Sequence, residues 1–382
     1  WIKPFGTIFI NSLKLIAIPL ILASLIKGIS DLKDISKLSS MGFLTIMTYI
    51  STTVIAVSIG LLVVNTMGPG KSISDETRTE LINAYSVDAE EKRDIAKEKK
   101  KSGPLQPIID LVPSNFLNAA SDNKNMLQVI FFSILFGIAM ILIPAEKAKP
   151  VKSFFDSLND VILKIIDIIM LCAPVGVFAL LASLIVEAPN IDLLKSLILY
   201  SVTLLTGLFV VIVVYLIFIK IFLKRNLKDF INGILPAQLV AFSTSSSAAT
   251  LPVTMDRVEN QLGVKKEISS FVLPIGATIN MDGTAVYQAV AAVFIAQTFG
   301  LDLSLIDQLG IISTATLASI GAAAVPSAGI IVLVIVLAQA GIPEAGLALI
   351  FAVDRPLDMF RTVVNVTGDA MVSLIVSKFQ KS

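Results

Sequence analysis

Residues 243–252 read Ser-Thr-Ser-Ser-Ser-Ala-Ala-Thr-Leu-Pro, and residues 318–329 read Ala-Ser-Ile-Gly-Ala-Ala-Ala-Val-Pro-Ser-Ala-Gly. Each of these two small-residue segments interrupts an apolar part of the chain. Each is followed by an apolar span that contains Asn-x-x-Gly, at residues 280–283 and again at residues 365–368. The same order of break, proline and Asn-x-x-Gly span therefore occurs twice, which indicates an internal repeat.

Such breaks have a particular meaning if the surrounding spans cross a membrane. Irregular backbone at membrane depth is tolerated only where protein or a water-filled cavity satisfies its polar groups. Opposed half-helices then offer N–H dipoles to an anion, and unwound carbonyl groups can coordinate cations. Either break alone could instead serve close helix packing through small residues. Two breaks in the same chain, beside charged residues, favour a ligand site.

The composition indicates a membrane protein. Hydrophobic residues make up 55% of the 382 residues and charged residues only 15%, whereas soluble domains are about 25% charged. Apolar stretches long enough for the roughly 20 residues that cross a bilayer lie at residues 5–26, 42–67, 126–145, 158–186, 193–223, 268–299, 305–341 and 345–377. We therefore expect an all-α integral membrane protein. The net charge of +1 gives no sign of a nucleic-acid partner, and a chain without histidine lacks the usual zinc sites.

Basic residues are concentrated in alternate loops between these stretches. They are Lys27, Lys33, Lys37, Lys147, Lys149, Lys152, Lys220, Lys224, Arg225, Lys228, Lys378 and Lys381. The positive-inside rule places these loops and the C-terminus in the cytoplasm, and Trp1 outside, for a multi-pass protein of the cell (inner) membrane. The first break then enters from the cytoplasm and the second from outside, so the repeat is inverted. We expect no cleavable signal at Trp1 and a further helix upstream of it.

The last apolar stretch carries five polar residues at spacings of four, three, four and four, which place them on one helical face. They are Asp354, Asp358, Arg361, Asn365 and Asp369. Charged side chains within a span are costly and usually mark a transport pathway or a ligand. The structural alternative is an internal Asp–Arg salt bridge that locks the bundle. Three carboxylates exceed one arginine, however, and sodium ions with a substrate ammonium group would balance that excess.

These side chains suggest the chemistry of the ligand. Arg361 can hold a carboxylate through two hydrogen bonds, and Asp358, one turn away, suits an ammonium group. Asn365 can serve an α-carboxylate. A ligand with one ammonium and two carboxylates fits, which means aspartate or glutamate. Asp282 and Asp369, with amide and backbone oxygens nearby, suit a hard monovalent cation, by analogy with oxygen-rich divalent sites.

Together these features resemble the dicarboxylate/amino acid:cation symporters, the glutamate transporter family. The resemblance extends from residues 3–6 (Lys-Pro-Phe-Gly) to residues 365–369 (Asn-Val-Thr-Gly-Asp). Its most specific motifs, besides the two breaks, are residues 273–284 (Leu-Pro-Ile-Gly-Ala-Thr-Ile-Asn-Met-Asp-Gly-Thr) and residues 358–362 (Asp-Met-Phe-Arg-Thr). The resemblance implies inverted repeats, two re-entrant helical hairpins and broken transmembrane helices. It also implies a homotrimer in which a transport domain moves as an elevator against a static scaffold.

The same resemblance assigns a part to each segment. Scaffold helices are expected at residues 1–40 and, with one transport-domain helix, at residues 108–223; residues 41–67 form another transport-domain helix. An extracellular polar loop is expected at residues 68–107, solvated rather than bound to lipid headgroups. Hairpin 1 is expected at residues 227–262, the broken helix at 267–299, hairpin 2 at 305–342 and the substrate-binding helix at 345–382.

The binding residues follow from the resemblance in the same way. Those implied for the acidic amino acid are Ser246, Ser247, Thr284, Val325, Gly329, Asp358, Arg361, Thr362 and Asn365. The first implied sodium site uses Gly276, Asn280, Asn365 and Asp369, and the second uses Thr278, Ser319 and Ile320. The third uses Tyr49, Thr52, Thr53, Asn280 and Asp282.

The chain departs from the family pattern at several positions. Gln288 replaces the glutamate that accepts a proton in animal members, which favours sodium coupling over mixed proton–sodium coupling. The second arginine near the family's site is missing, because the two positions that can hold it are Ser245 and Met359. Arg355 is the nearest substitute. Phe360 stands where some prokaryotic members have glycine.

The leading function is sodium-coupled uptake of L-aspartate or L-glutamate. A proton-coupled symporter of glutamate or of C4-dicarboxylates and an anion-conducting channel of the same fold are the alternatives. An enzyme is disfavoured, because the sequence has no histidine and no evident Ser/Lys pair that would activate a nucleophile.

Overall fold

The structure is a computed structural model that describes residues 2–30, 39–74, 76, 78–79, 112–121, 125–172, 174–176, 178–179, 182, 191–320 and 328–380. Its elements are α1 (Lys3–Ser30), α2 (Ser39–Met67), η1 (Pro69–Ser72), α6 (Phe116–Ala120), α7 (Met126–Leu142), α8 (Ala145–Leu171), α10 (Ile191–Ile221), α11 (Leu227–Thr244), α12 (Ser247–Asn260), α13 (Lys266–Ile279), α14 (Asp282–Thr298), α15 (Leu305–Ile320), α16 (Ala328–Ala340), η3 (Glu344–Gly346) and α17 (Leu347–Phe379). No β-strand occurs in these ranges, and the predicted all-α class is confirmed.

Five helical segments of the described chain are long and apolar enough to cross a membrane. They are Pro4–Ser30, Met41–Ser72, Asp192–Ile221, Lys266–Thr298 and Leu347–Phe379. One predicted boundary differs from the structure, because α8 begins at Ala145 and not near residue 158. Its first turns carry Glu146 and several lysines, so the helix extends well outside the apolar stretch from which it was predicted.

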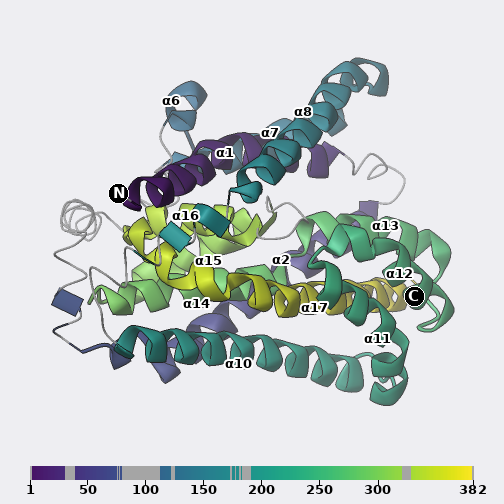
Figure 1. Cartoon of the computed structure of the whole chain (residues 1–382). Helices are drawn as coiled ribbons and strands as arrows, with labels where there is room; N and C mark the ends of the chain where they lie inside the picture. The colour runs from purple at the N-terminus through teal and green to yellow at the C-terminus, as the bar shows by residue number, and fades with distance from the viewer. Residues whose placement is uncertain are drawn as a thin grey trace.

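The helices form two groups (Figure 1). In the first, α1 packs against α7 and α8, and these three helices form one layer of the molecule. The second group is built around α14, which packs against α2, α10, α15, α16 and α17. The groups meet where α1 contacts α16 and where α7 contacts α15. All the candidate charged residues of the last span therefore belong to the second group.

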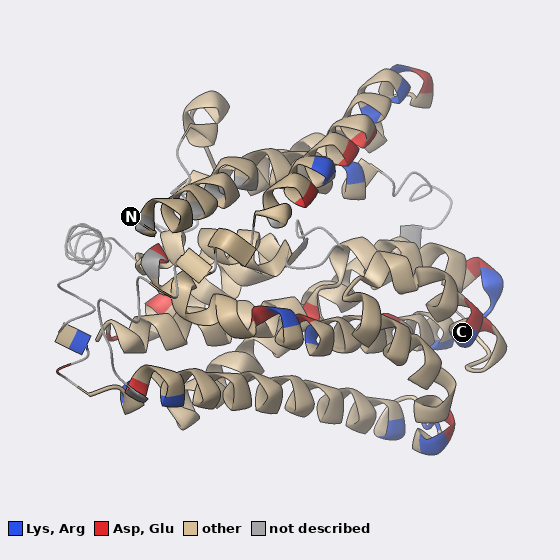
Figure 2. Cartoon of the chain, in the orientation of Figure 1, with Lys and Arg blue, Asp and Glu red and all other residues tan. Residues whose placement is uncertain are grey.

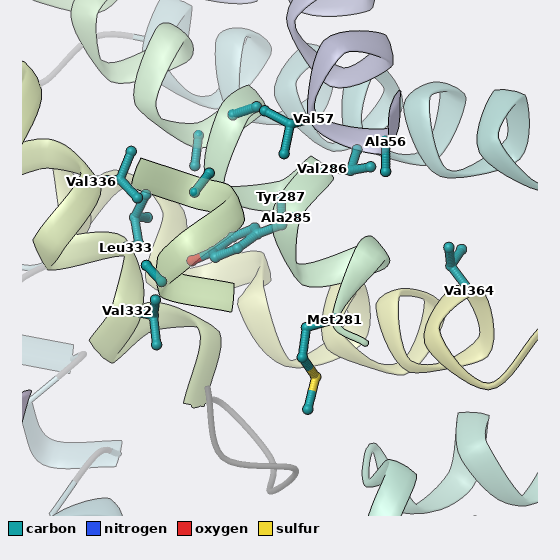
Figure 3. Packing of buried hydrophobic residues seen from close by; sticks show 14 of the residues in the cluster. Ala56, Val57, Met281, Ala285, Val286, Tyr287, Val332, Leu333, Val336 and Val364 are labelled. Atoms are coloured by element: carbon teal, nitrogen blue, oxygen red, sulfur yellow. The ribbon is translucent and has the colours of Figure 1, made fainter. Parts of the chain in front are cut away.

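The helix α14 forms the core of this second group. Every residue from Asp282 to Thr298 is buried, as expected of a helix that is covered on all sides. Figure 3 shows Val286 of α14 facing Ala56 of α2, and Tyr287 pointing toward Leu333 of α16. The polar residues at the start of α14 are thus held in an environment that excludes water.

Helices are interrupted in the part of the chain where the sequence predicted breaks. Between α11 and α12, Ser245 adopts a left-handed conformation (φ 51°), and Ser246 caps α12 by accepting a hydrogen bond from the Ala249 amide at 3.2 Å. Between α13 and α14, Asn280 leaves the helical region (φ −87°, ψ 100°). The tip between α15 and α16, residues 321–327, lies outside the described residues. Helix α17 runs without a break from Leu347 to Phe379.

The distribution of charge matches a bilayer environment. Figure 2 shows the described charged residues mainly at helix ends, along α8 and in a group inside α17. Large apolar side chains such as Leu15, Leu135 and Phe209 are exposed on α1, α7 and α10. Exposed apolar faces of this kind are expected where helices contact lipid. The charged group inside α17 therefore needs a separate explanation.

Candidate functional site

A buried arginine and two carboxylates lie at the centre of α17. One terminal nitrogen of Arg361, Nη2, is 3.0 Å from Asp354 Oδ1 and 2.8 Å from Asp358 Oδ1. Arg361 is fully buried, and Asp354 and Asp358 are 3% and 6% exposed. A more exposed arginine, Arg355, reaches the other oxygen of Asp358 at 3.6 Å. The internal Asp–Arg salt bridge that the spacing allowed is thus present in this structure.

The rest of the Arg361 guanidinium faces the other half of the predicted ligand site. Its Cζ atom lies 3.9 Å from the centroid of the Tyr287 ring, at a distance suited to a cation–π contact. A Cβ atom added to Gly329 would lie 3.4 Å from Arg361 Nη1 and 3.3 Å from Thr284 Cγ2. Gly329, Thr284 and Arg361 are therefore neighbours, although they come from α16, α14 and α17.

The start of α14 is fastened to α17 by a close backbone approach. The Gly283 amide donates a 2.7 Å hydrogen bond to Asn365 Oδ1. A Cβ atom at Gly283 would lie 2.2 Å from the Arg361 carbonyl oxygen, so only glycine fits here. The side-chain nitrogen of Asn365 donates to Met281 Sδ at 3.3 Å, and its second hydrogen remains available for a ligand. Thr362 donates to the Asp358 carbonyl at 2.9 Å and is buried beside it.

A second cluster, rich in oxygen atoms, lies at the break between α13 and α14. The side-chain nitrogen of Asn280 donates to Asp369 Oδ1 at 2.8 Å and to the Asn365 carbonyl at 3.2 Å. A Cβ atom at Gly276 would lie 2.3 Å from both Asp369 Oδ1 and Tyr49 Oη. The Asn280 side-chain oxygen is buried and has no hydrogen-bond partner among the described residues. It is an unused ligand oxygen next to a buried carboxylate.

Asp282 forms the other half of this cluster. Thr53 of α2 donates to Asp282 Oδ1 at 2.6 Å, and Tyr215 of α10 donates to Asp282 Oδ2. Thr52 donates to the Tyr49 carbonyl at 3.0 Å, and the Thr53 oxygen lies 2.9 Å from the same carbonyl. Tyr215 is not among the residues predicted from the sequence. A single hydroxyl in a long apolar helix carries no pattern, and the carboxylate it contacts lies 67 positions away.

This arrangement can bind cations and an anion in one dehydrated region. Asp282 and Asp369 are buried, and no ion pair to either is found in the described part of the chain. Unpaired carboxylates inside a membrane protein are costly, and such groups usually mark an ion or substrate pathway. The carboxylate, amide and hydroxyl oxygens around Asn280 are the ligand type that hard cations prefer.

A model of the "Sodium:dicarboxylate symporter family" matches residues 1–379 of the chain. The chain belongs to this family. Excitatory amino acid transporter 3 of Mus musculus is 39% identical over 414 residues, which cover 98% of this chain and 79% of the relative. The proton/sodium-glutamate symport protein of Bacillus caldotenax is 36% identical over 387 residues, covering 100% of this chain and 88% of the relative. The protein of the same name from Bacillus subtilis (strain 168) is 33% identical over 380 residues.

In this symporter family member, the structure brings many of the expected ligand residues together and leaves others apart. The neighbours described above form a continuous site on α13, α14, α16 and α17. Ser246 and Ser247 are buried in hairpin 1, which packs on α17 through an edge contact of Phe242 with Phe360 at 5.0 Å. The Ser247 hydroxyl has no hydrogen-bond partner among the described residues.

The second expected sodium site is only partly described. Thr278 donates to the Ile275 carbonyl at 2.9 Å, and Ser319 donates to the Thr316 carbonyl at 2.9 Å. Helices α13 and α15 pack together, but no hydrogen bond joins Thr278 to Ser319 in the described chain. The side chain of Ile320 and the whole of Val325 lie outside the described residues.

The departure at Gln288 also has a structural setting. Gln288 lies in the middle of α14 and is fully buried. Neither its amide nitrogen nor its amide oxygen has a hydrogen-bond partner among the described residues. A neutral amide at this position adds no titratable charge to the core of this symporter.

Proposed function

We propose that the protein is a secondary active symporter that couples the entry of sodium ions to the uptake of L-aspartate or L-glutamate. The observation that carries the proposal is the fully buried Arg361, which is held between Asp354 and Asp358. Arginine is the residue that binds a carboxylate bidentately, and burial strengthens that interaction. The names of the bacterial and animal relatives are consistent with an acidic substrate.

The substrate would replace part of the internal salt bridge. The guanidinium group of Arg361 would bind the side-chain carboxylate of the substrate, with the Thr284 hydroxyl beside it. Asp358 would then bind the ammonium group of the substrate. The Asn365 amide nitrogen and the backbone of the Ser247 region would receive the α-carboxylate. A ligand without an amine would bring no cation to the buried Asp358, and the nearby Arg355 is half exposed. An amino acid therefore fits better than a C4-dicarboxylate.

Sodium ions would occupy the oxygen-rich cluster around the broken helix. Asp369, Asn280 and the Gly276 region supply one group of oxygens, and Asp282, Thr53 and Tyr49 supply the other. The neutral side chain of Gln288 supports sodium rather than proton coupling. The family description itself names sodium, and the bacterial relatives are called proton/sodium symporters.

The movement, assembly and orientation belong to the same proposal. Most of the expected ligand residues lie on helices that pack around α14, while α1, α7 and α8 pack as a separate layer; this division supports an elevator domain and a scaffold. We infer a homotrimer in the cell (inner) membrane with the C-terminus in the cytoplasm. The basic residues at the ends of α1, α10 and α17 support this orientation.

Proteoliposomes test the function directly. With sodium outside and potassium inside, labelled aspartate should accumulate above its external concentration. The same vesicles with equal sodium on both sides should not accumulate aspartate above its external concentration, and vesicles with choline in place of sodium should take up none. A further experiment applies a pH gradient without sodium. Aspartate uptake under that condition would mean that protons, and not sodium ions, are the coupling ions. Current without concentrative uptake would mean an anion channel, and competition by succinate as strong as by aspartate would mean a dicarboxylate carrier.

A further inference from the structure

A cavity of about 260 Å³ opens at the ends of α10 and α17, and none of the buried carboxylates is in its lining. It is lined by Leu223, Arg225, Leu374, Ser377 and Lys378. Both helices are among those long and apolar enough to cross a membrane, and both end at this point. The cavity therefore lies at the boundary between the hydrocarbon region and water, with two apolar residues on one side and two cations on the other.

The surroundings of the cavity are strongly basic. The end of α10, the connection to α11 and the first turn of α11 add Lys220, Lys224 and Lys228 to the two cations of the lining, against one acidic residue, Asp229. Figure 2 shows basic residues gathered where α10 meets α11. The side chains of Lys220, Lys224, Arg225 and Lys228 are exposed. None of them forms an ion pair in the described residues.

The backbone at the end of α10 presents these cations in a fixed way. Lys224 has a positive φ of 52°, in the left-handed region where glycine is the usual residue at a helix end. Amides of Leu223 and Arg225 donate to the Phe218 and Ile219 carbonyls and close the helix. A lysine at this position adds a positive charge beside the cavity, although glycine would adopt this backbone conformation more easily.

Lys378 connects the two helices across the cavity. Its ammonium group donates to the Phe222 carbonyl at the end of α10. An ammonium group has three donors, so two remain for a ligand. The negative end of the α10 dipole is thus covered by a cation. On the membrane side, Ile221, Phe222 and Phe379 are about 60% exposed, where acyl chains would lie.

We propose that this cavity binds the phosphate headgroup of an anionic phospholipid, through Arg225 and Lys378. Basic pockets between transmembrane helices at the membrane surface are suited to such headgroups. The apolar Leu223 and Leu374 and the exposed rings beside them contact the upper part of the acyl chains. This proposal does not depend on which substrate or coupling ion the protein uses.

Native mass spectrometry of the full chain tests the site. The protein is delipidated in detergent, then mixed with phosphatidylcholine micelles that contain either phosphatidylglycerol or no anionic lipid. Phosphatidylglycerol should remain bound, and the double variant Arg225→Gln/Lys378→Gln should bind it roughly 30-fold more weakly. The matched control is Lys147→Gln/Lys149→Gln, which removes two exposed lysines at the start of α8, where the lining of this cavity does not reach. It should bind as the parent does.

Two further measurements keep the test decisive. The charge-retaining pair Arg225→Lys/Lys378→Arg should keep most of the affinity, and Arg225→Gln alone should weaken binding about fivefold even if the double variant does not fold. Equal losses in the cavity pair and in the α8 pair would indicate diffuse attraction and overturn the proposal. Inorganic phosphate that binds the lipid-free protein as tightly as phosphatidylglycerol does, or displaces the lipid at equal concentration, would also overturn it.

Discussion

Replacing Arg361 with methionine separates the two roles that the structure gives to this residue. Methionine fills much of the volume of the arginine stem but leaves Asp354 and Asp358 without their buried cation. Removing one partner of a buried ion pair costs about 3–5 kcal/mol. Arg355 faces Asp358 at 3.6 Å, but its side chain is 53% exposed, so it offsets only part of this cost. Arg361→Met should therefore be less stable than the parent by an amount of that order.

A second substitution should restore stability without restoring binding. In Arg361→Met/Asp354→Asn only Asp358 keeps its charge, and Arg355 still faces it, so most of the lost stability should return. Aspartate binding should remain lost in both variants. Two hydrogen bonds to a charged group are worth about 3–6 kcal/mol, and their loss weakens binding by at least about 100-fold.

The two readouts are thermal unfolding of the detergent-solubilised protein and calorimetric titration of aspartate at saturating sodium. Asp354→Asn alone serves as the matched control, because it keeps the Arg361–Asp358 pair. If the double variant unfolded like the parent and bound aspartate with parental affinity, Arg361 would be a structural residue only, and the substrate assignment would fail.

Three smaller predictions concern the cluster around the broken helix and the lid. Asp369→Asn keeps the shape of the side chain but removes its charge, so the sodium concentration needed for half-maximal aspartate binding should rise at least about tenfold. Tyr215→Phe removes a donor to a buried carboxylate and should cost about 1.5–3 kcal/mol in unfolding measurements; Tyr200→Phe, whose hydroxyl has no hydrogen-bond partner among the described residues, should cost almost nothing. Gly329→Ala adds a methyl group at 3.3–3.4 Å from the site and should weaken aspartate binding several-fold, whereas Gly310→Ala points into open space and should leave binding unchanged. Equal effects within either pair would contradict the assigned contacts.

Much of the fold could be predicted because hydrophobic length and small-residue breaks are local signals. The left-handed Ser245 lies within the break predicted at residues 243–252, and the turn at Asn280 lies within the motif at residues 273–284. Helix ends outside the hydrocarbon region were less predictable. The first turns of α8 are charged, and a helix there is stabilised by its own backbone hydrogen bonds rather than by an apolar pattern.

The site was predictable where its residues share one helix. The spacing of Asp358 and Arg361 on α17 is sufficient to place them together, and they are 2.8 Å apart. Contacts between different helices could not be predicted from the spacing of residues along the sequence. Tyr215 reaches Asp282 only because α10 packs beside α14, and nothing in the sequence near Tyr215 indicates that packing. The sequence also left open whether Arg361 pairs with its own helix or with a ligand, and the salt bridge in the structure is compatible with both.

The charge balance of the core explains why the proposed transport should need cations. The buried carboxylates of the described chain are Asp282, Asp354, Asp358 and Asp369, and the buried cation is Arg361. Aspartate or glutamate adds one further net negative charge to this region, where a low dielectric makes like charges repel strongly. An anionic substrate therefore cannot bind tightly until cations have entered near Asp282 and Asp369. Under the proposed function, sodium raises the affinity for the substrate because it neutralises Asp282 and Asp369, and these two carboxylates do not bind the substrate themselves. Linkage then requires aspartate to raise sodium affinity by the same factor.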